Sequence, residues 1–332
     1  MTHMDSELKV AQLIDAPDSD LRAIHRKPVI FPHRLGELAM LDDDHLALLI
    51  ERAAKAGPMH YNLHIHQEDE DGFEYMQPGL LAEKGEEADG HRILDMIKAG
   101  QLWLQIEHLD VLAPHLYGLL VRAYKELEER VPGFSFRNLY TNLLISGPKA
   151  KVSPHIDVAE VILFHIRGHK RMRLWDPARY PVPDEVQEAI ILREQFEDIR
   201  LPREWKDENA GEAYDLAPGY GVSFPYMWPH SVENLGDFNV SLQTEYHYPA
   251  TMRRYGALYA NGVLRRHLKL EPKGTGPGVV GESLRAAAGF VAKKMKIHAP
   301  KPRKVRLTYV VDPEAPGLVR RIPDDKVPEL MK

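Results

Sequence analysis

A series of short β-rich segments in the middle of the chain constrains its fold most strongly. Stretches rich in Val, Ile, Leu, Tyr and Thr are separated by turn residues and lie at 136–146, 151–159, 160–168, 169–177, 214–225, 230–236 and 239–249. Short strands at this spacing are typical of an antiparallel sandwich or barrel. A charged, partly helical insertion at 184–212 interrupts the series. The sequence therefore predicts a β-rich core over residues 134–250.

Helical patterns flank this core on both sides. Apolar residues recur every three or four positions at 34–56, 91–110, 113–134, 251–268 and 283–298. Asp43 or Asp44 is placed to cap the helix that follows it. We expect a mainly helical region at 1–133 that packs on the core, and a helical, basic region at 251–332 that ends in a tail.

The composition excludes several classes of protein. The 332 residues contain no cysteine, which excludes disulfides, thiolate metal sites and a cysteine nucleophile. No apolar run approaches the roughly 18 residues of a membrane-spanning helix, and the N-terminus lacks the basic start and apolar core of a signal peptide. We therefore expect a cytoplasmic protein without a membrane partner.

The charge is distributed unevenly along the chain, although the net charge is only -6. From Met252 onward there are 18 Lys and Arg against 7 Asp and Glu, which leaves 25 basic and 42 acidic residues before it. A basic tail can bind nucleic acid or an acidic partner, or dock on its own acidic body. Because no recognition motif or aromatic platform accompanies the charge, the sequence argues against nucleic acid. The acidic body favours neutral or basic substrates.

Two polar residues open an otherwise apolar strand. His155 and Asp157 are two positions apart, so both side chains point to one face. A buried polar pair needs a partner, which could be a salt bridge or a metal ion. His230, near the start of a late strand, would complete a set of two histidines and one carboxylate. Such a set occupies one face of an octahedral ferrous ion and leaves three positions open.

A lysine opens a second strand of apolar inward positions. Lys170, Met172 and Leu174 share one strand face, and Arg171 and Arg173 share the other. A lysine among inward apolar residues needs an anionic partner, and the far carboxylate of 2-oxoglutarate would supply one. Alternatively, the side chain extends to water at the strand end. The spacing leaves both interpretations open.

Other aromatic and histidine residues carry weaker signals. His60, His64 and His66 share one face of an early strand, where they could bind a metal, although we favour an exposed polar face. Trp228 either forms a wall of the iron pocket or anchors the core. Glu245 and His247 are expected at the surface or the rim.

Four motifs in order resemble the JmjC and cupin-like group of Fe(II) and 2-oxoglutarate-dependent oxygenases. They are His-x-Asp at 155–157, Gly-x-Lys at 168–170, a Gly before an aromatic-Pro strand, and Trp-x-His at 228–230. The resemblance spans roughly residues 134–250 and is strongest with the asparaginyl-hydroxylase and bacterial cupin-like branch. It implies a mainly β fold with flanking helices (α+β), built on a double-stranded β-helix, or jelly-roll, core.

The resemblance also implies the residues of the site. His155, Asp157 and His230 correspond to the catalytic iron ligands, and Lys170 to the residue that binds the C5 carboxylate of 2-oxoglutarate. The same pocket would be lined by Tyr140, Asn142, Gln243, near the C1 carboxylate, and Trp228. The chain departs from the family at Val152, where relatives often carry a hydroxyl. Ser153 could substitute only if the strand register shifts.

The activity implied by the resemblance is hydroxylation of a C–H bond in a peptide, a protein side chain or a small metabolite, with Fe(II) and 2-oxoglutarate. One alternative is a non-catalytic cupin-like sensor or binding protein with a metal-occupied or degenerate pocket. Another is a cupin enzyme that uses a different metal without 2-oxoglutarate. The helix at 251–268 resembles C-terminal helices that form homodimers in the asparaginyl-hydroxylase branch. Its apolar face would pair with a second copy or cover the open edge of the barrel; that face comprises Tyr255, Leu258, Tyr259 and Leu264.

Overall fold

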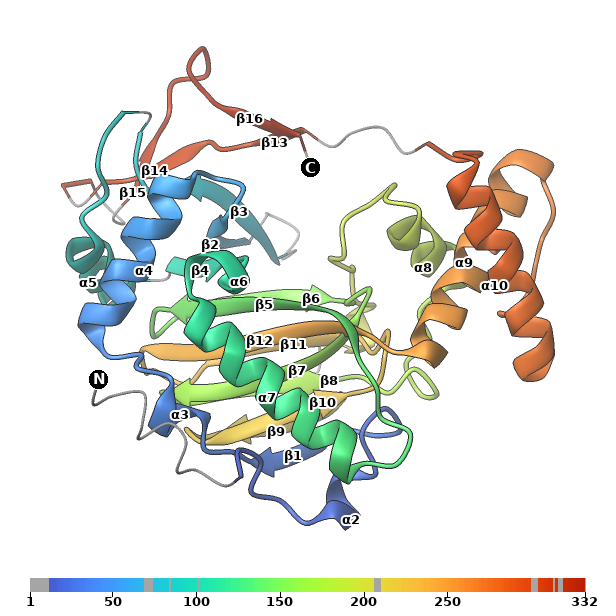
Figure 1. Cartoon of the computed structure of the whole chain (residues 1–332). Coiled ribbons are helices and arrows are strands. Elements are labelled where there is room, and N and C mark those ends of the chain that lie inside the picture. The colour runs from blue at the N-terminus through green and yellow to red at the C-terminus, as the bar shows by residue number, and fades with distance from the viewer. Residues whose placement is uncertain are drawn as a thin grey trace.

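Two antiparallel β-sheets face each other at the centre of the computed structural model (Figure 1). The structure describes residues 12–68, 74–83, 85–100, 102–205, 210–299, 304–312, 314–315 and 319–331. Within these residues the larger sheet has ten strands, in the order β1-β10-β7-β12-β5-β4-β2-β3-β14-β15. Neighbours are antiparallel throughout, except for the parallel pair of β3 and β14.

The strands of the larger sheet come from the whole length of the chain. Their bounds are β1 (Val29–Pro32), β2 (Tyr61–Glu68), β3 (Glu74–Leu80), β4 (Leu102–Ile106), β5 (Arg137–Ser146), β7 (Glu160–Arg167), β10 (Tyr220–Phe224), β12 (Asn239–His247), β14 (Tyr309–Val311) and β15 (Val319–Arg321). The N-terminal region therefore contributes strands to the sheet as well as helices around it, and the sheet extends beyond the predicted core at 134–250.

The smaller sheet closes the jelly roll. It has four strands in the order β6 (Lys151–His155), β11 (His230–Asn234), β8 (Lys170–Leu174) and β9 (Glu212–Leu216). A separate two-stranded ribbon pairs β13 (Lys304–Arg306) with β16 (Glu329–Met331). The architecture is the predicted jelly roll with flanking helices.

Helices cover the outer face of the larger sheet and extend from one end of the jelly roll. They are α2 (Asp18–Leu21), α3 (Leu35–Leu38), α4 (Asp43–Ala56), α5 (Gly90–Ala99), α6 (Leu109–Leu112), α7 (Pro114–Arg130), α8 (Asp184–Ile191), α9 (Pro249–Leu268) and α10 (Gly278–Lys294). In Figure 1, α7 runs across the strands, while α8, α9 and α10 stand together to one side. Among the described residues, no helix combines the length and the apolar character that crossing a bilayer would require.

Strand alternation separates two apolar cores. On β5, Leu143 and Ile145 face the helices and pack in the main core with Tyr124 of α7, whereas Leu144 faces the inside of the jelly roll. The interior core also contains residues of the smaller sheet, such as Met172. The larger sheet is thus apolar on its helix side and mixed on its inner side, which is where a polar site can form.

Three local expectations were wrong. The helix predicted over 91–110 ends at Ala99, and Leu102–Ile106 forms β4, whose side chains alternate between buried and half-buried. The cap of α4 is Asp42, whose carboxylate accepts a hydrogen bond from the backbone N–H of His45. The sequence also suggests a tight hairpin at the Arg167-Gly168-His169 turn, but the turn, in which Gly168 has a φ of 79°, does not close one, because β7 and β8 belong to different sheets.

The C-terminal helices form a satellite core of their own. Leu258 and Tyr259 of α9 are buried against Ile191 and Leu192, at the end of α8 and just after it. This part of the α9 face therefore packs inside the chain. α9 and α10 approach closely at two glycines, since a Cβ on Gly289 would lie 2.0 Å from the backbone oxygen of Gly256.

We predict that Gly289→Ala destabilises the α9–α10 pair, because the new methyl group forces the helices apart. The cost should be about 1–3 kcal/mol, which is typical of overpacking. Gly118→Ala is the matched control, since Gly118 lies in α7 with nothing within 4 Å of its added Cβ. It should be neutral or up to about 1 kcal/mol more stable. Urea unfolding, with hydrogen exchange of α10, measures both; equal midpoints for the two variants would contradict the packing argument.

Candidate metal centre

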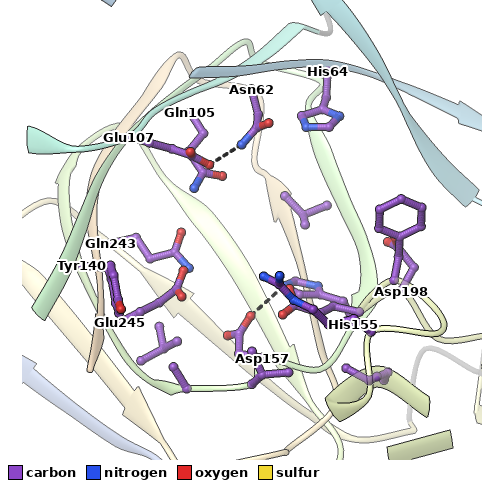
Figure 2. A pocket seen from close by; sticks show the side chains of 18 of the residues that line it. Asn62, His64, Gln105, Glu107, Tyr140, His155, Asp157, Asp198, Gln243 and Glu245 are labelled. Atoms are coloured by element: carbon purple, nitrogen blue, oxygen red, sulfur yellow. Dashed lines mark hydrogen bonds and ion pairs between the residues drawn. The ribbon is translucent and has the colours of Figure 1, made fainter. Parts of the chain in front are cut away.

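The smaller sheet brings together the three side chains that the sequence singled out. β6 pairs with β11 so that His155 lies opposite His230, and Asp157 follows β6 by two residues. Nε2 of His155 lies 3.6 Å from Oδ1 of Asp157, and Nε2 of His230 lies 3.3 Å from Oδ2. One ligand atom from each residue lies within 4.8 Å of the others, the spacing expected of atoms that share one ion. Figure 2 shows the side chains of His155 and Asp157 close together on one side of the cavity.

Backbone carbonyls fix the orientation of both imidazoles. Nδ1 of His155 lies 2.8 Å from the carbonyl oxygen of Ser153, and Nδ1 of His230 lies 3.0 Å from that of Trp228. A carbonyl can only accept a hydrogen bond, so each Nδ1 must carry the proton. In the neutral rings, each Nε2 then has a lone pair directed at the space between the three side chains. This is the arrangement in which histidines bind metal ions.

With the proton of each ring on Nδ1, no ring proton lies between the three groups. Burial, with His230 close by, lowers the pKa of His155 to about 4. Burial opposes ionisation of Asp157, but the two imidazoles still hold its pKa below the usual value. Oδ2 of Asp157 is fully buried and has no hydrogen-bond donor among the described residues. Two nitrogens with lone pairs and one carboxylate, buried together, are suited to binding a divalent cation. They are less suited to forming an ion pair with one another, because neither ring carries a charge.

A cavity of about 1430 Å³ contains this cluster. Its lining extends from Lys170 inside the jelly roll to Tyr255 on α9 and His298 after α10. Apolar side chains line the part around the cluster, among them Leu144, Val161, Leu163, Met172 and Phe224. An apolar lining of this kind limits the access of water to the cluster.

Lys170 lies in the cavity in the way that strand alternation predicted. It is 3% exposed and shares its face of β8 with Met172 and Leu174, which are also buried. The described residues place no carboxylate within 4.0 Å of its ammonium, and burial lowers its pKa to about 7. The side chain therefore does not extend to water, and it has no anionic partner from the described chain.

The other residues of the predicted pocket are placed in different ways. Tyr140 and Gln243 line the cavity. Asn142 is buried and contacts Glu245 at 3.5 Å. The Trp228 side chain packs against the interior core, and its carbonyl holds His230. The roles inferred for these residues remain predictions.

The early histidines form no such cluster. Within the described residues, the cluster of His155, Asp157 and His230 is the one group of three metal-ligand side chains that converge. The His60 ring contacts that of His108, and the His64 ring contacts that of Trp103. The side chain of His66 and the acidic loop at 69–73 lie outside the described residues.

Sequence reasoning missed several cavity residues. Ser146 and Asn234 lie beside Lys170, because Asn234 is paired with Lys170 across the strands and donates a hydrogen bond of 2.9 Å to Ser146. Glu245, expected at the rim, stands in the cavity wall, and so does Glu107 after β4. For Glu245, the available signal was the polar residue at every second position of β12.

The cupin-like domain is the family whose model matches the chain, over residues 82–252. No curated protein matches. Among solved structures, that of Escherichia coli ycfD has a TM-score of 0.46 at 16% identity, over 85% of this chain and 68% of the other. A structure of YcfD, a ribosomal oxygenase from Escherichia coli, with cobalt and 2-oxoglutarate gives 0.45 at 18% identity, over 86% and 68%. A cupin superfamily protein from Desulfitobacterium hafniense gives 0.21 at 13% identity, over 34% and 72%.

The family match spans the segment that carries the three-ligand cluster. It begins before α5 and ends at the start of α9, so it includes the whole His155, Asp157 and His230 cluster and Lys170. It also covers more than half of the 332 residues. The chain therefore belongs to the cupin-like domain family.

Proposed function

We propose that this chain is an Fe(II) and 2-oxoglutarate-dependent dioxygenase. In this proposal it hydroxylates a C–H bond of a peptide, a protein side chain or a small metabolite. One observation carries the proposal: the ammonium group of Lys170 is buried, lacks an acidic partner among the described residues, and lines the same cavity as the three-ligand cluster. A cavity with a cation-binding cluster and a buried ammonium suits a small dianion that reaches both.

A second donor supports an anion site beside Lys170. Asn234 donates hydrogen bonds to Ser146 Oγ at 2.9 Å and to the Gly147 carbonyl oxygen at 2.6 Å. Because Ser146 Oγ accepts that bond, its own proton is free to donate to a carboxylate. Ser146 thus supplies a hydroxyl group in place of the one that relatives often carry at the position of Val152. Both residues line the cavity.

Each group has a distinct task in this proposal. His155, Asp157 and His230 would hold the ion by one face, and the carbonyls of Ser153 and Trp228 would keep the two rings in place. When bound, ferrous iron with 2-oxoglutarate supplies the oxidising chemistry, in which dioxygen converts the co-substrate to succinate and carbon dioxide and hydroxylates the substrate. Lys170 and Ser146 would orient the co-substrate. The apolar walls would keep bulk water from the reacting groups.

We predict that the intact protein converts 2-oxoglutarate to succinate with ferrous ion, slowly, even without a substrate. His155→Ala and Asp157→Ala should lose this turnover by at least about 100-fold, since removing a ligand costs more than the 10–100-fold of an outer-shell change. His91→Ala, at an exposed histidine far from β6 in the sequence, is the control. NMR detection of succinate measures all four proteins. Metal binding without succinate formation would favour the non-catalytic sensor, and equal turnover in His155→Ala would refute the site.

We also predict that 2-oxoglutarate binding depends on the charge of Lys170. Lys170→Met, of similar length, should weaken binding by at least about tenfold, and Ser146→Ala by less. In the free protein the pKa of Lys170 is about 7, and only the ammonium form attracts a carboxylate. Wild-type affinity should therefore be highest below pH 7 and decline as the pH rises above it, whereas Lys170→Met should show no such decline. Calorimetry with Mn²⁺ present measures both; an affinity independent of pH in the wild type would contradict this assignment.

A homodimer remains a proposal, now with α10 as its contact. The part of the α9 face at Leu258 and Tyr259 is used within the chain, but α10 exposes an apolar stripe at helical spacing, comprising Val280, Leu284, Val291 and Met295. Such a stripe needs a partner. We predict that the protein sediments as a dimer and that Leu284→Glu shifts it to monomer, whereas Glu128→Gln on α7 does not. A wild-type monomer at micromolar concentrations would rule this contact out.

A further inference from the structure

The ribbon of β13 and β16 borders the cavity that contains the three-ligand cluster. Figure 1 shows the ribbon standing clear of both sheets, above the jelly roll. Four consecutive residues, 304–307, line the cavity, whereas β16 contributes Leu330. Successive side chains of a strand point to opposite faces, so four lining residues in a row indicate that the edge of β13 borders the cavity, rather than one face of the ribbon.

This edge of β13 has no neighbouring strand in the part of the chain that the structure describes. β13 pairs only with β16, where Val305 lies opposite Leu330. The backbone N–H of Leu307 donates a hydrogen bond of 3.0 Å to the carbonyl oxygen of Pro328 across the ribbon. Because N–H groups alternate in direction along a strand, that of Arg306 points to the free edge. Such an edge is a template for another extended chain.

The free edge lies in a strongly basic stretch of the sequence. Residues 283–311 contain eight Lys and Arg and no Asp or Glu. Four of these cations are exposed and line the cavity, namely Lys293, Lys296, Lys304 and Arg306. Lys304 and Arg306 are two positions apart and therefore share one face of β13. Positive charge thus borders the cavity where the free edge lies.

Two of these lysines lack an acidic partner. Among the described residues, no carboxylate oxygen lies within 4.0 Å of the ammonium group of Lys293 or Lys296. Lys293 instead donates a hydrogen bond of 2.7 Å to the hydroxyl of Tyr255. Burial, and after it the charge of Lys293, lowers the pKa of His247, the last residue of β12. Lys293 therefore stands where the basic border meets the larger sheet.

The two cations of β13 have partners that an incoming acid can replace. Lys304 contacts Glu329 at 2.9 Å, and Arg306 contacts Asp324 at 3.8 Å. All four side chains are exposed, and exposed ion pairs contribute little because water screens them. A carboxylate that arrives on an extended chain can therefore take the place of either acid at little cost.

We propose that the free edge of β13 binds an extended acidic segment of a peptide or protein as an added strand, which brings a neighbouring residue of that segment into the cavity. The proposal narrows the substrate class, and it rests on the proposed function for what happens to the residue that enters. Backbone pairing supplies affinity, and Lys296, Lys304 and Arg306 select acidic side chains. The sequence favoured neutral or basic substrates because of the acidic first 251 residues, but this border is built by the basic C-terminal region.

Other occupants of the edge fit less well. A nucleic acid has no backbone amides to pair with a strand, and its bases need aromatic faces on which to stack. The ring of Tyr255 beside the basic border already contacts Phe290 and the ammonium group of Lys293. A second copy of this chain would bring the same positive charge to the edge, and like charges repel. A small metabolite would leave the strand edge unused.

The test measures the binding of blocked heptapeptides to the full chain by titration calorimetry, without iron or 2-oxoglutarate. The acidic probe is acetyl-Thr-Glu-Val-Glu-Val-Glu-Thr-amide, and its neutral counterpart has Gln in place of Glu. Two further versions of the acidic probe carry methylated backbone nitrogens, at Val in one and at Glu in the other. An oligothymidylate of similar charge is the nucleic-acid probe.

We expect the acidic peptide to bind at least about tenfold more tightly than the Gln peptide, with a preference that shrinks at high salt. Because alternate N–H groups of an added strand face its neighbour, one of the two methylated versions should lose at least about tenfold in affinity. The other version should bind as the unmodified peptide does. The oligothymidylate should bind more weakly than the acidic peptide.

Two variants of one residue separate the strand edge from the charge. Arg306→Gln removes the charge and should weaken binding of the acidic peptide about two- to fivefold. Arg306→Pro also removes the outward N–H, while the pairing with β16 is kept, and should weaken binding about fivefold more. Lys296→Gln should act as Arg306→Gln does. Lys125→Gln, at an exposed lysine of α7, is the control and should change nothing.

Each outcome decides the proposal. A preference for the acidic peptide, with loss in one methylated version, supports it. Equal affinity for the acidic and Gln peptides, equal affinity for the unmodified and both methylated peptides, equal binding in Arg306→Pro and Arg306→Gln, tighter binding of oligothymidylate, or no binding overturns it. A sedimenting dimer that Arg306→Pro converts to monomer would assign the edge to a second copy and overturn it too.

The same measurements keep this surface separate from the proposed function, because iron and 2-oxoglutarate are absent from them. Binding of the acidic peptide by a chain that makes no succinate would refute the proposed function and leave the strand edge standing. Succinate formation by a chain that binds none of the peptides would refute the strand edge alone.

Discussion

The antiparallel pairing of β6 with β11 is the constraint on which the cavity chemistry depends. It sets His155 opposite His230, and the side chains of a strand alternate between faces. A slip of one residue would turn one imidazole away from the cavity. The register is fixed from the other side, because β11 also pairs along its length with β8, where Met172 and Leu174 are anchored in the interior. The apolar packing of β8 therefore positions a histidine two strands away.

The same cavity contains polar groups that weaken the free protein. Burying the ammonium group of Lys170 without an acid, and half-burying the carboxyl group of Glu245 without a base, opposes folding. Each group would be better satisfied by a ligand of the opposite charge than by anything in the described chain. Groups of this kind cluster in binding sites, where a ligand compensates them.

Prediction from the sequence succeeded where a strand has one buried face and one more exposed face. The alternation of Lys170, Met172 and Leu174 fixes which side chains turn inward, and the structure places them there. It failed at β4, because only Gly100 and one further residue separate Leu102 from the end of α5, and a single glycine can also stand inside a helix. As a result, the sequence pattern did not mark Gln105 and Glu107 as residues of the cavity. The polar residues of the cavity come together because β2, β4, β5 and β12 lie side by side in the sheet, and such long-range pairing cannot be read from local patterns.

The uneven charge of the sequence has a structural counterpart in the C-terminal region. Arg265 and Arg266 of α9 bind Glu188, whose side chain is fully buried, and Arg320 binds Glu83 on the acidic body. The exposed pairs contribute little, but a buried carboxylate between two guanidiniums ties α8 to α9 firmly, since removing either partner would leave a buried charge. The sequence left three partners open for the basic C-terminal region: nucleic acid, an acidic partner, or the acidic part of the same chain. These contacts are with the acidic part of the same chain. Because residues of α9 and α10 also line the cavity, this docking shapes one side of the cavity that contains His155, Asp157 and His230.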